Sequence, residues 1–197
     1  MKASPKIIVF LTLLLLALAL AGCGIPEPTT QATAGPTATT ALTADEHFRQ
    51  GNTYAQQGQF EEAIAEYLAV LETEPDHVSA MTNLGVAYYN TGQLEEAIAQ
   101  YQDALKIAPN DADIHSNLAA AYVQVGDLDT ALQEYQRAVE LEPGLAQAHF
   151  GLGVVYAELG ETENAIAAFE QFQAVDSGQD PTATELASQY LEQLKGQ

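Results

Sequence analysis

The amino-acid sequence predicts an all-α fold, a solenoid in which four helical hairpins of one repeated design stack on one another. The first observation behind this prediction is a fixed period, since Pro75, Pro109 and Pro143 lie 34 residues apart. The second is that residues of matching type recur at the same spacing. A period of this length indicates stacked helix pairs, each of which buries its apolar face against its neighbours. A tyrosine column and an alanine column carry the pattern, at Tyr54, Tyr88, Tyr122 and Tyr156 and at Ala63, Ala97, Ala131 and Ala165.

Within each unit a glycine separates two helical segments. Glycine adopts positive φ without steric cost, so it commonly ends a helix that turns sharply. A small residue in the first segment lets the two helices approach, and an aromatic residue in the second segment completes the pattern. The turn glycines are Gly58, Gly92, Gly126 and Gly160, the small residues are Gly51, Gly85, Ala119 and Gly153, and the aromatic residues are Tyr67, Tyr101, Tyr135 and Phe169.

These columns resemble the tetratricopeptide repeat, which has the same period and the same aromatic, small and proline positions. The resemblance implies four units, at residues 44–77, 78–111, 112–145 and 146–177. Two departures stand out. Ser177 occupies the place of a fourth proline, and the family's frequent tryptophan is replaced by His47, Met81, His115 and His149.

Residues 178–197 are predicted to form a capping helix. Leu186, Tyr190, Leu191 and Leu194 recur at spacings of three and four, which places them on one face of an amphipathic helix. Such a helix would cover the last hairpin, because an open end of a solenoid leaves apolar surface in water.

Residues 1–22 have the order of a secretory signal peptide. Lys2 and Lys6 precede an apolar run from Ile7 to Leu20, and the small residues Ala21 and Gly22 follow. As a helix, a run of about 14 residues would span only ~21 Å, less than the ~30 Å hydrocarbon core of a bilayer. A permanent transmembrane helix is therefore the weaker interpretation.

The residues from Leu20 to Cys23 resemble the lipobox of bacterial lipoproteins. This resemblance implies that Cys23 receives a diacylglyceryl group and that the preceding peptide is removed; the alternative is a chance cysteine after an uncleaved anchor. Residues 23–43 would then be the lipidated cysteine and a Thr/Pro/Ala-rich tether, expected to be disordered because it has too little apolar surface to bury. We expect an extracytoplasmic protein anchored to the cell membrane, or to the outer membrane where the host has two.

Charge and motifs exclude several classes of function. The chain has 6 basic and 27 acidic residues, a formal net charge of −21, so we expect no nucleic-acid partner. One cysteine excludes an internal disulfide and a Cys-rich metal site. No phosphate loop, zinc-protease motif or serine-hydrolase motif is present, so we expect neither enzyme activity nor a cofactor. The histidine column is not expected to hold a metal, because stacked units lie ~8–10 Å apart whereas metal bonds are ~2 Å long.

In the tetratricopeptide family the first helices line a concave binding groove. The resemblance implies that Asn83 and Asn117 offer donors and acceptors to a peptide backbone, although solvated groove positions are an equal alternative. Some members of the family hold a C-terminal carboxylate with a clamp of Lys, Arg and Asn. Asn52 and Asn83 match this clamp, but its cationic positions are taken by Phe48, Asp113 and Asn117, so a ligand that ends in a carboxylate is disfavoured. The candidate groove residues are Phe48, Arg49, Asn52, Asn83, Val86, Tyr89, Asn117 and Phe150.

The function expected from these features is that of a membrane-anchored protein-interaction scaffold of the bacterial cell envelope. It would bind a neutral or basic protein segment in the groove and help to assemble an envelope complex. One alternative is a self-associating structural lipoprotein whose groove is not a ligand site. A more remote alternative is an accessory subunit of an envelope enzyme.

Overall fold

The computed structural model describes residues 42–196, and the described part is all-helical. Cys23 and the predicted signal peptide, with almost all of the predicted tether, lie outside the described residues. Residues 40–197 form a compact unit of their own. Its helices are α1 (Ala44–Gln56), α2 (Phe60–Thr73), α3 (Val78–Asn90), α4 (Leu94–Ile107), α5 (Ala112–Val125), α6 (Leu128–Leu141), α7 (Ala146–Glu158), α8 (Thr162–Asp176) and α9 (Pro181–Lys195).

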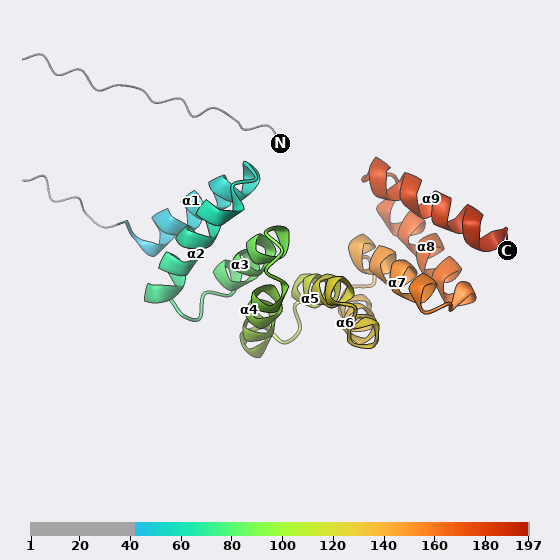
Figure 1. The fold of residues 1–197 in the computed structure, drawn as a ribbon, viewed down its shortest axis with the longest axis horizontal. Helices are drawn as coiled ribbons and strands as arrows, with labels where there is room; N and C mark the ends of the chain where they lie inside the picture. Colours follow the sequence, from blue (N-terminus) through green and yellow to red (C-terminus); the bar gives the residue numbers. More distant parts are fainter. Residues whose placement is uncertain (1–41, 197) are drawn as a thin grey trace, which may run out of the picture. The chain divides into compact units, whose positions relative to one another are not determined.

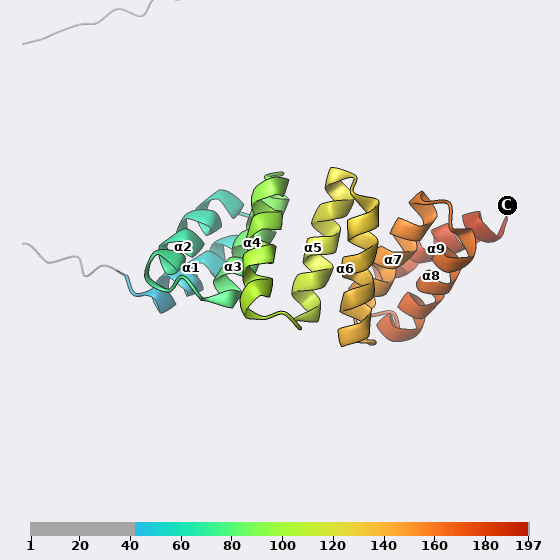
Figure 2. The ribbon, with the colours of Figure 1, turned by 90° about the horizontal axis from the view of Figure 1, so that it is seen from below.

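Successive helices pair as antiparallel hairpins, α1 with α2, α3 with α4, α5 with α6 and α7 with α8. Each second helix also packs against the first helix of the next hairpin, as Figures 1 and 2 show for α4, α5 and α6. Successive first helices touch each other, whereas successive second helices have at most marginal contact. The first helices therefore lie on the inner side of the stack. The predicted all-α solenoid of helical hairpins is confirmed.

The local turns form for the reasons that the sequence suggests. Each of the four turn glycines has a positive φ, between 73° at Gly58 and 82° at Gly126, where a side chain would strain the backbone. At the start of α1, Thr43 and Glu46 form a capping box, in which each side chain satisfies the backbone amide of the other residue. Acidic residues occupy the first turns of α2, α4, α6 and α8, where the helix dipole favours negative charge.

The buried side chains form four clusters that follow the stacking of the units. Each joins the small and aromatic residues of one second helix to apolar residues of the following first helix or, at the end, of α9. In the first cluster, for example, Ala63 and Tyr67 of α2 meet Leu84 and Ala87 of α3. Because these clusters draw only on residues 48–194, we expect residues 40–197 to fold on their own.

The aromatic ring of each second helix lies against a first helix at a residue without a side chain. A Cβ atom built on Gly51 would lie 2.7 Å from the Tyr67 ring, and one on Gly85 would lie 2.6 Å from the Tyr101 ring. The third unit differs. Its first helix carries Ala119 at this position, in the same buried cluster as Tyr135, and the Tyr135 ring also lies against Gly151 of the following unit.

The α8–α9 junction is held by a buried carboxylate. Asp176 is 6% exposed and accepts hydrogen bonds from the amides of Gly178 and Asp180 and from the Thr184 hydroxyl. Ser177, at the predicted proline position, adopts the left-handed conformation with φ 51°. The helix that follows caps the stack through Tyr190, Leu191 and Leu194, together with Ala183 and Ala187. The prediction for Leu186 is wrong, because its side chain is 43% exposed.

The close approach of ring and glycine leads to a stability prediction. Gly85→Ala should lower the free energy of unfolding by about 1–2 kcal/mol, because overpacking against Tyr101 outweighs the gain in helix propensity. Urea unfolding of residues 40–197 measures the change. Gly144→Ala is the matched control, since a Cβ atom there meets nothing within 4 Å, and it should leave stability unchanged or slightly higher. Equal midpoints for the Gly85 variant and the parent would contradict the prediction.

Candidate functional site

Three adjoining hollows run along the first helices and form one groove. The first lies between α1 and α3 and has a volume of about 300 Å³, the second lies where α3, α5 and α7 meet and measures about 240 Å³, and the third reaches α7 and measures about 160 Å³. Val86 lines both the first and the second, and Tyr89 and Ala120 line both the second and the third. Because neighbouring hollows share walls, they can hold one continuous chain.

No charged side chain lines these three hollows. Amide side chains line the first two, and the third is mainly aliphatic and aromatic. The acidic residues in the first turns of the second helices are exposed and away from this lining. A strongly acidic protein therefore presents an uncharged groove. The lining residues are Asn52, Ala55, Gln56, Tyr67, Asn83, Val86, Tyr89, Asn90, Tyr101, Asn117, Ala120, Val123, Gln124, Tyr135, Gln147, Phe150, Gly151 and Val154.

Six of the eight candidate groove residues line the hollows, namely Asn52, Asn83, Val86, Tyr89, Asn117 and Phe150. The structure places the other two elsewhere. The Phe48 ring packs against the Tyr67 and His77 rings, with centroids 6.1 and 4.8 Å away. Arg49 lies on the face of α1 where the stack begins. Arg49 has the repeat position of Asn83, but no unit precedes α1 in the described stack to complete a groove around it.

The two asparagines at the α1–α3 end of the groove are joined to each other and to a tyrosine. Asn52 Oδ1 accepts hydrogen bonds from the Tyr67 hydroxyl and from Asn83 Nδ2, each 2.8 Å long. Asn117 Oδ1 accepts a longer bond of 3.4 Å from Gln147 Nε2. The Asn83 donor is thus partly committed within the protein, which leaves Asn117 the freer of the pair predicted to contact a peptide.

The tyrosines of the second helices also reach the groove, which sequence reasoning missed. Tyr67, Tyr101 and Tyr135 each line one hollow although their rings are buried. Burial raises the pKa of all three hydroxyls above the usual value, so they stay protonated at physiological pH. The signal that could have found them lies at the repeat position of Asn52. In the second and third units this position holds Val86 and Ala120, which line the hollows together with Tyr101 and Tyr135.

Comparison with protein families agrees with the geometry. Four models of the tetratricopeptide repeat match the chain, at residues 48–112, 100–133, 121–160 and 146–178. The chain carries tetratricopeptide (TPR) repeats. None of the four models describes an enzyme family, and a search among curated proteins gave no significant match.

Solved TPR structures show the same fold. A TPR protein of Thermus thermophilus is 23% identical, with 77% of this chain and 81% of that chain covered and a TM-score of 0.67. YrrB, named as a TPR protein with an unusual peptide-binding site, is 25% identical, with 75% and 76% covered and a TM-score of 0.61. The first TPR of Spaghetti (RPAP3), bound to an HSP90 peptide, is 26% identical, with 59% and 93% covered and a TM-score of 0.58. In all, 356 chains match significantly, so the fold alone does not identify a partner.

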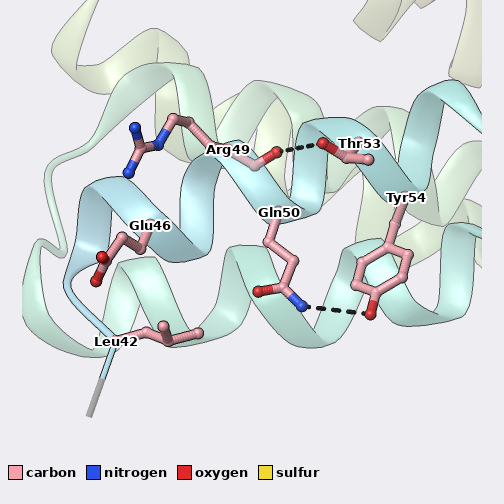
Figure 3. A pocket seen from close by; sticks show the side chains of 6 residues that line it. All are labelled: Leu42, Glu46, Arg49, Gln50, Thr53 and Tyr54. Atoms are coloured by element: carbon pink, nitrogen blue, oxygen red, sulfur yellow. Dashed lines mark hydrogen bonds between the residues drawn. The ribbon is translucent and has the colours of Figure 1, made fainter. Parts of the chain in front are cut away.

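A further hollow of about 470 Å³ marks the N-terminal end of the TPR stack rather than the groove (Figure 3). Its lining includes Glu46, Gln50 and Thr53 of α1. In the second unit the same repeat positions are Ala80, Leu84 and Ala87, which are buried against the preceding unit. In α1 these positions are polar, and Figure 3 shows the bonds from Gln50 to Tyr54 and from Thr53 to the Arg49 carbonyl. The face therefore suits water rather than another repeat.

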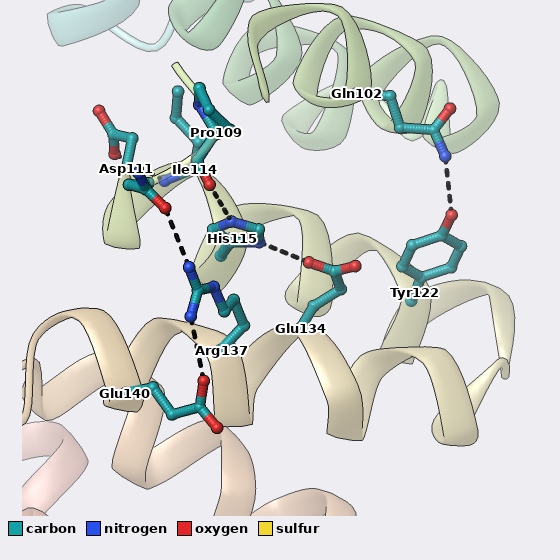
Figure 4. A network of polar contacts seen from close by, with 10 residues as sticks. Gln102, Pro109, Asp111, Ile114, His115, Tyr122, Glu134, Arg137 and Glu140 are labelled. Atoms are coloured by element: carbon teal, nitrogen blue, oxygen red, sulfur yellow. Dashed lines mark hydrogen bonds and ion pairs between the residues drawn. The ribbon is translucent and has the colours of Figure 1, made fainter. Parts of the chain in front are cut away.

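The histidines of the repeat column have structural contacts, which Figure 4 shows for His115. His115 Nδ1 lies 2.6 Å from Glu134 Oε2, and its Nε2 lies 3.1 Å from the Pro109 carbonyl oxygen, so the ring links α5 to α6 and to the preceding turn. His47 contacts Glu66 in the same way, at 2.6 Å. His149, which faces no acid at that position, contacts the Pro143 carbonyl oxygen at 2.9 Å.

Two further properties belong to the part of the chain that the structure describes. Between residues 42 and 196, no three His, Cys, Asp or Glu side chains gather closely enough to hold a metal ion. Over the same range, no helix has both the length and the apolar character needed to cross a bilayer.

The polar end face leads to a prediction about self-association. The triple variant Glu46→Ala, Gln50→Leu and Thr53→Ala gives α1 the apolar residues of the second unit, at a surface that no repeat unit of the described residues covers. Because a contiguous apolar patch favours association, this variant should form dimers or larger species as its concentration rises, whereas the parent stays monomeric. Light scattering of residues 40–197 measures both. Glu61→Ala, an exposed change on α2, is the control for lost charge. A monomeric triple variant would disprove the role assigned to this face.

Proposed function

We propose that this TPR protein is an interaction scaffold that holds an extended segment of another protein in the groove along α1, α3, α5 and α7. One observation carries the proposal: three hollows with shared walls form a continuous groove without charged lining. Two structures of at least 25% identity support it, since one is named for a peptide-binding site and the other holds a peptide.

The partner segment is neutral or basic. Of the four basic residues in the described range, Lys106, Arg137 and Lys195 are already paired with acids on exposed helix faces. The protein therefore carries a large excess of carboxylates, with a formal net charge of −21, which repel acidic segments and steer basic ones toward the protein. The uncharged lining then favours ligand residues that need no charged partner once they are buried.

We propose further that the scaffold is a lipoprotein of the bacterial cell envelope, anchored through Cys23 and active in the assembly of an envelope complex. This part rests on the order of residues 1–22 and on the Leu20-Ala21-Gly22-Cys23 sequence. Two or more acyl chains would hold the protein stably at a membrane, where a single chain would not. The end face of α1 is polar, which disfavours the alternative of a polymer built by end-to-end stacking.

The scaffold proposal predicts the effect of filling the groove. Ala120 lines two of the three hollows, so Ala120→Arg places a long charged side chain where the ligand would lie. Capture of a partner from envelope extracts should weaken at least about tenfold, because a charge buried under the ligand has no partner group.

The matched control is Ala99→Arg, which adds the same charge at an exposed position of α4. It should leave both partner capture and melting temperature unchanged. If the two arginine variants lose the same partner equally, or retain it equally, the groove is not the binding site and the scaffold proposal fails in this form.

The anchoring proposal predicts that Cys23→Ser prevents lipidation. The hydroxyl is a much weaker nucleophile than the thiolate, so the variant should take up no diacylglyceryl group and should leave the membrane fraction or remain unprocessed. Labelling of cells with a radioactive fatty acid measures this. A variant labelled as strongly as the parent would show that Cys23 is not the modified residue.

A further inference from the structure

The imidazole ring of His115 lies between two hydrogen-bond acceptors in the third unit (Figure 4). Its Nδ1 is 2.6 Å from Glu134 Oε2 on α6, and its Nε2 is 3.1 Å from the backbone carbonyl oxygen of Pro109, in the turn before α5. The His115 side chain is 12% exposed and that of Glu134 is 25% exposed. Because the ring is largely shielded, water cannot readily replace either contact.

Two acceptors need two donors. A neutral imidazole carries one N–H and one lone pair, an ionised carboxylate only accepts, and a backbone carbonyl never donates. With a neutral His115 and an ionised Glu134, one ring nitrogen would therefore point its lone pair at an oxygen atom.

Both contacts become hydrogen bonds when the His115–Glu134 pair holds one more proton. The pair is then either an imidazolium with a carboxylate, or a neutral imidazole that accepts from a protonated carboxyl group and donates to Pro109. The observed geometry suits the pair with this additional proton, whichever of the two groups carries it.

The second and fourth units lack this arrangement. In the second unit the histidine and the acid are replaced by Met81 and Gln100, neither of which titrates. In the fourth unit Ala168 takes the place of the acid, and His149 Nε2 lies 2.9 Å from the Pro143 carbonyl oxygen. The single N–H of a neutral ring is enough for that bond.

The first unit repeats half of the arrangement. His47 Nδ1 lies 2.6 Å from Glu66 Oε2, but the carbonyl that would correspond to that of Pro109 belongs to residue 41, outside the described residues. Within residues 42–196, the third unit is where a histidine meets both acceptors.

The cations at this end of the third unit are engaged with groups other than the ring. Lys106 pairs with Asp103, while Arg137 donates to Asn110 and to Glu140, as Figure 4 shows. Glu134 is therefore the charged partner of the ring. Besides it, the charged groups at this end are Asp103 and Lys106 on α4, Asp111 and Asp113 at the start of α5, and Arg137, Glu140 and Glu142 at the end of α6.

The two contacts of His115 fix the start of a central helix. They join α5 to α6 within its own hairpin and to the turn that follows α4. Because α5 packs against α4 and α6 and also touches α3 and α7, a change at its start acts on the middle of the stack.

We propose that His115 and Glu134 form a proton-operated clamp, which takes up one proton as the pH falls and then ties α5 to α6 and to the preceding turn at once. The unfolded chain does not hold the two acceptors near the ring, so the folded state binds this proton more tightly. The free energy of unfolding therefore rises as the pH falls through the range in which histidine changes charge, between about pH 8 and pH 6. This inference does not depend on the scaffold proposal.

Urea unfolding of residues 40–197 at about pH 8, 7 and 6 compares the parent with Glu134→Gln. The glutamine amide can donate to Nδ1 of a neutral ring while Nε2–H donates to Pro109, so this variant needs no additional proton. One linked proton changes the folding equilibrium constant by at most tenfold per pH unit. From pH 8 to pH 6 we expect this constant to rise about tenfold in the parent relative to the variant. At pH 8 the variant should unfold at the same urea concentration as the parent or at a higher one.

Glu140→Gln is the matched control, because it removes the same charge from α6 at a side chain that is 68% exposed and paired with Arg137 rather than with the ring. It should keep the pH dependence of the parent. If Glu134→Gln lowers the urea midpoint by the same amount at every pH, Glu134 is a structural partner alone and the clamp is overturned. If Glu140→Gln removes the pH dependence to the same extent, net charge is the cause, and the clamp is again overturned.

Discussion

The contact on which the rest of this structure depends is the packing of one aromatic ring per unit against a first helix at a residue with no side chain. Tyr67 against Gly51 and Tyr101 against Gly85 bring the two helices of a hairpin closer than any larger residue would allow. Because each ring also belongs to a buried cluster that includes the next first helix, the same contact joins one unit to the next. Hairpin closure and stacking are therefore one interaction, as expected for a repeat that cannot bury its apolar face alone.

The same packing gives the groove its chemistry. A ring that passes between two first helices carries its hydroxyl to their inner side, so a core residue also becomes part of the binding surface. In the first unit Asn52 accepts a hydrogen bond from this hydroxyl, and in the last unit Phe169 has no hydroxyl. In the two middle units the hydroxyl has no hydrogen-bond partner among residues 42–196. The groove thus differs in character along its length although every unit has nearly the same backbone.

The charged residues that stabilise the helices do not line the groove that would bind a partner. Acidic residues lie in the first turns of the second helices, where unpaired amides and the helix dipole favour them by ~0.3–1 kcal/mol each. The ion pairs of Lys106, Arg137 and Lys195 are exposed and contribute little. Since neither group lines the three hollows, the net negative charge acts on an approaching ligand from outside the groove and leaves the lining itself uncharged.

The amino-acid sequence by itself determined the repeat, the turns and most of the groove wall, because these depend on local rules. A period of 34 residues, a glycine where φ must be positive and a small residue opposite an aromatic one specify a helical hairpin wherever they recur.

What only the tertiary structure decided depends on which neighbour each position meets. Arg49 shares a repeat position with Asn83, yet α1 has no preceding unit in the described stack and the residue lies on the end face. Tyr135 shares a position with Tyr101, yet its ring also lies against Gly151 of the following unit. Leu186 is 43% exposed, because α9 docks through Ala187 and Leu191 instead. A periodic sequence assigns equal positions to equal roles, whereas packing depends on contacts that differ at the ends of the stack and wherever one side chain changes in volume.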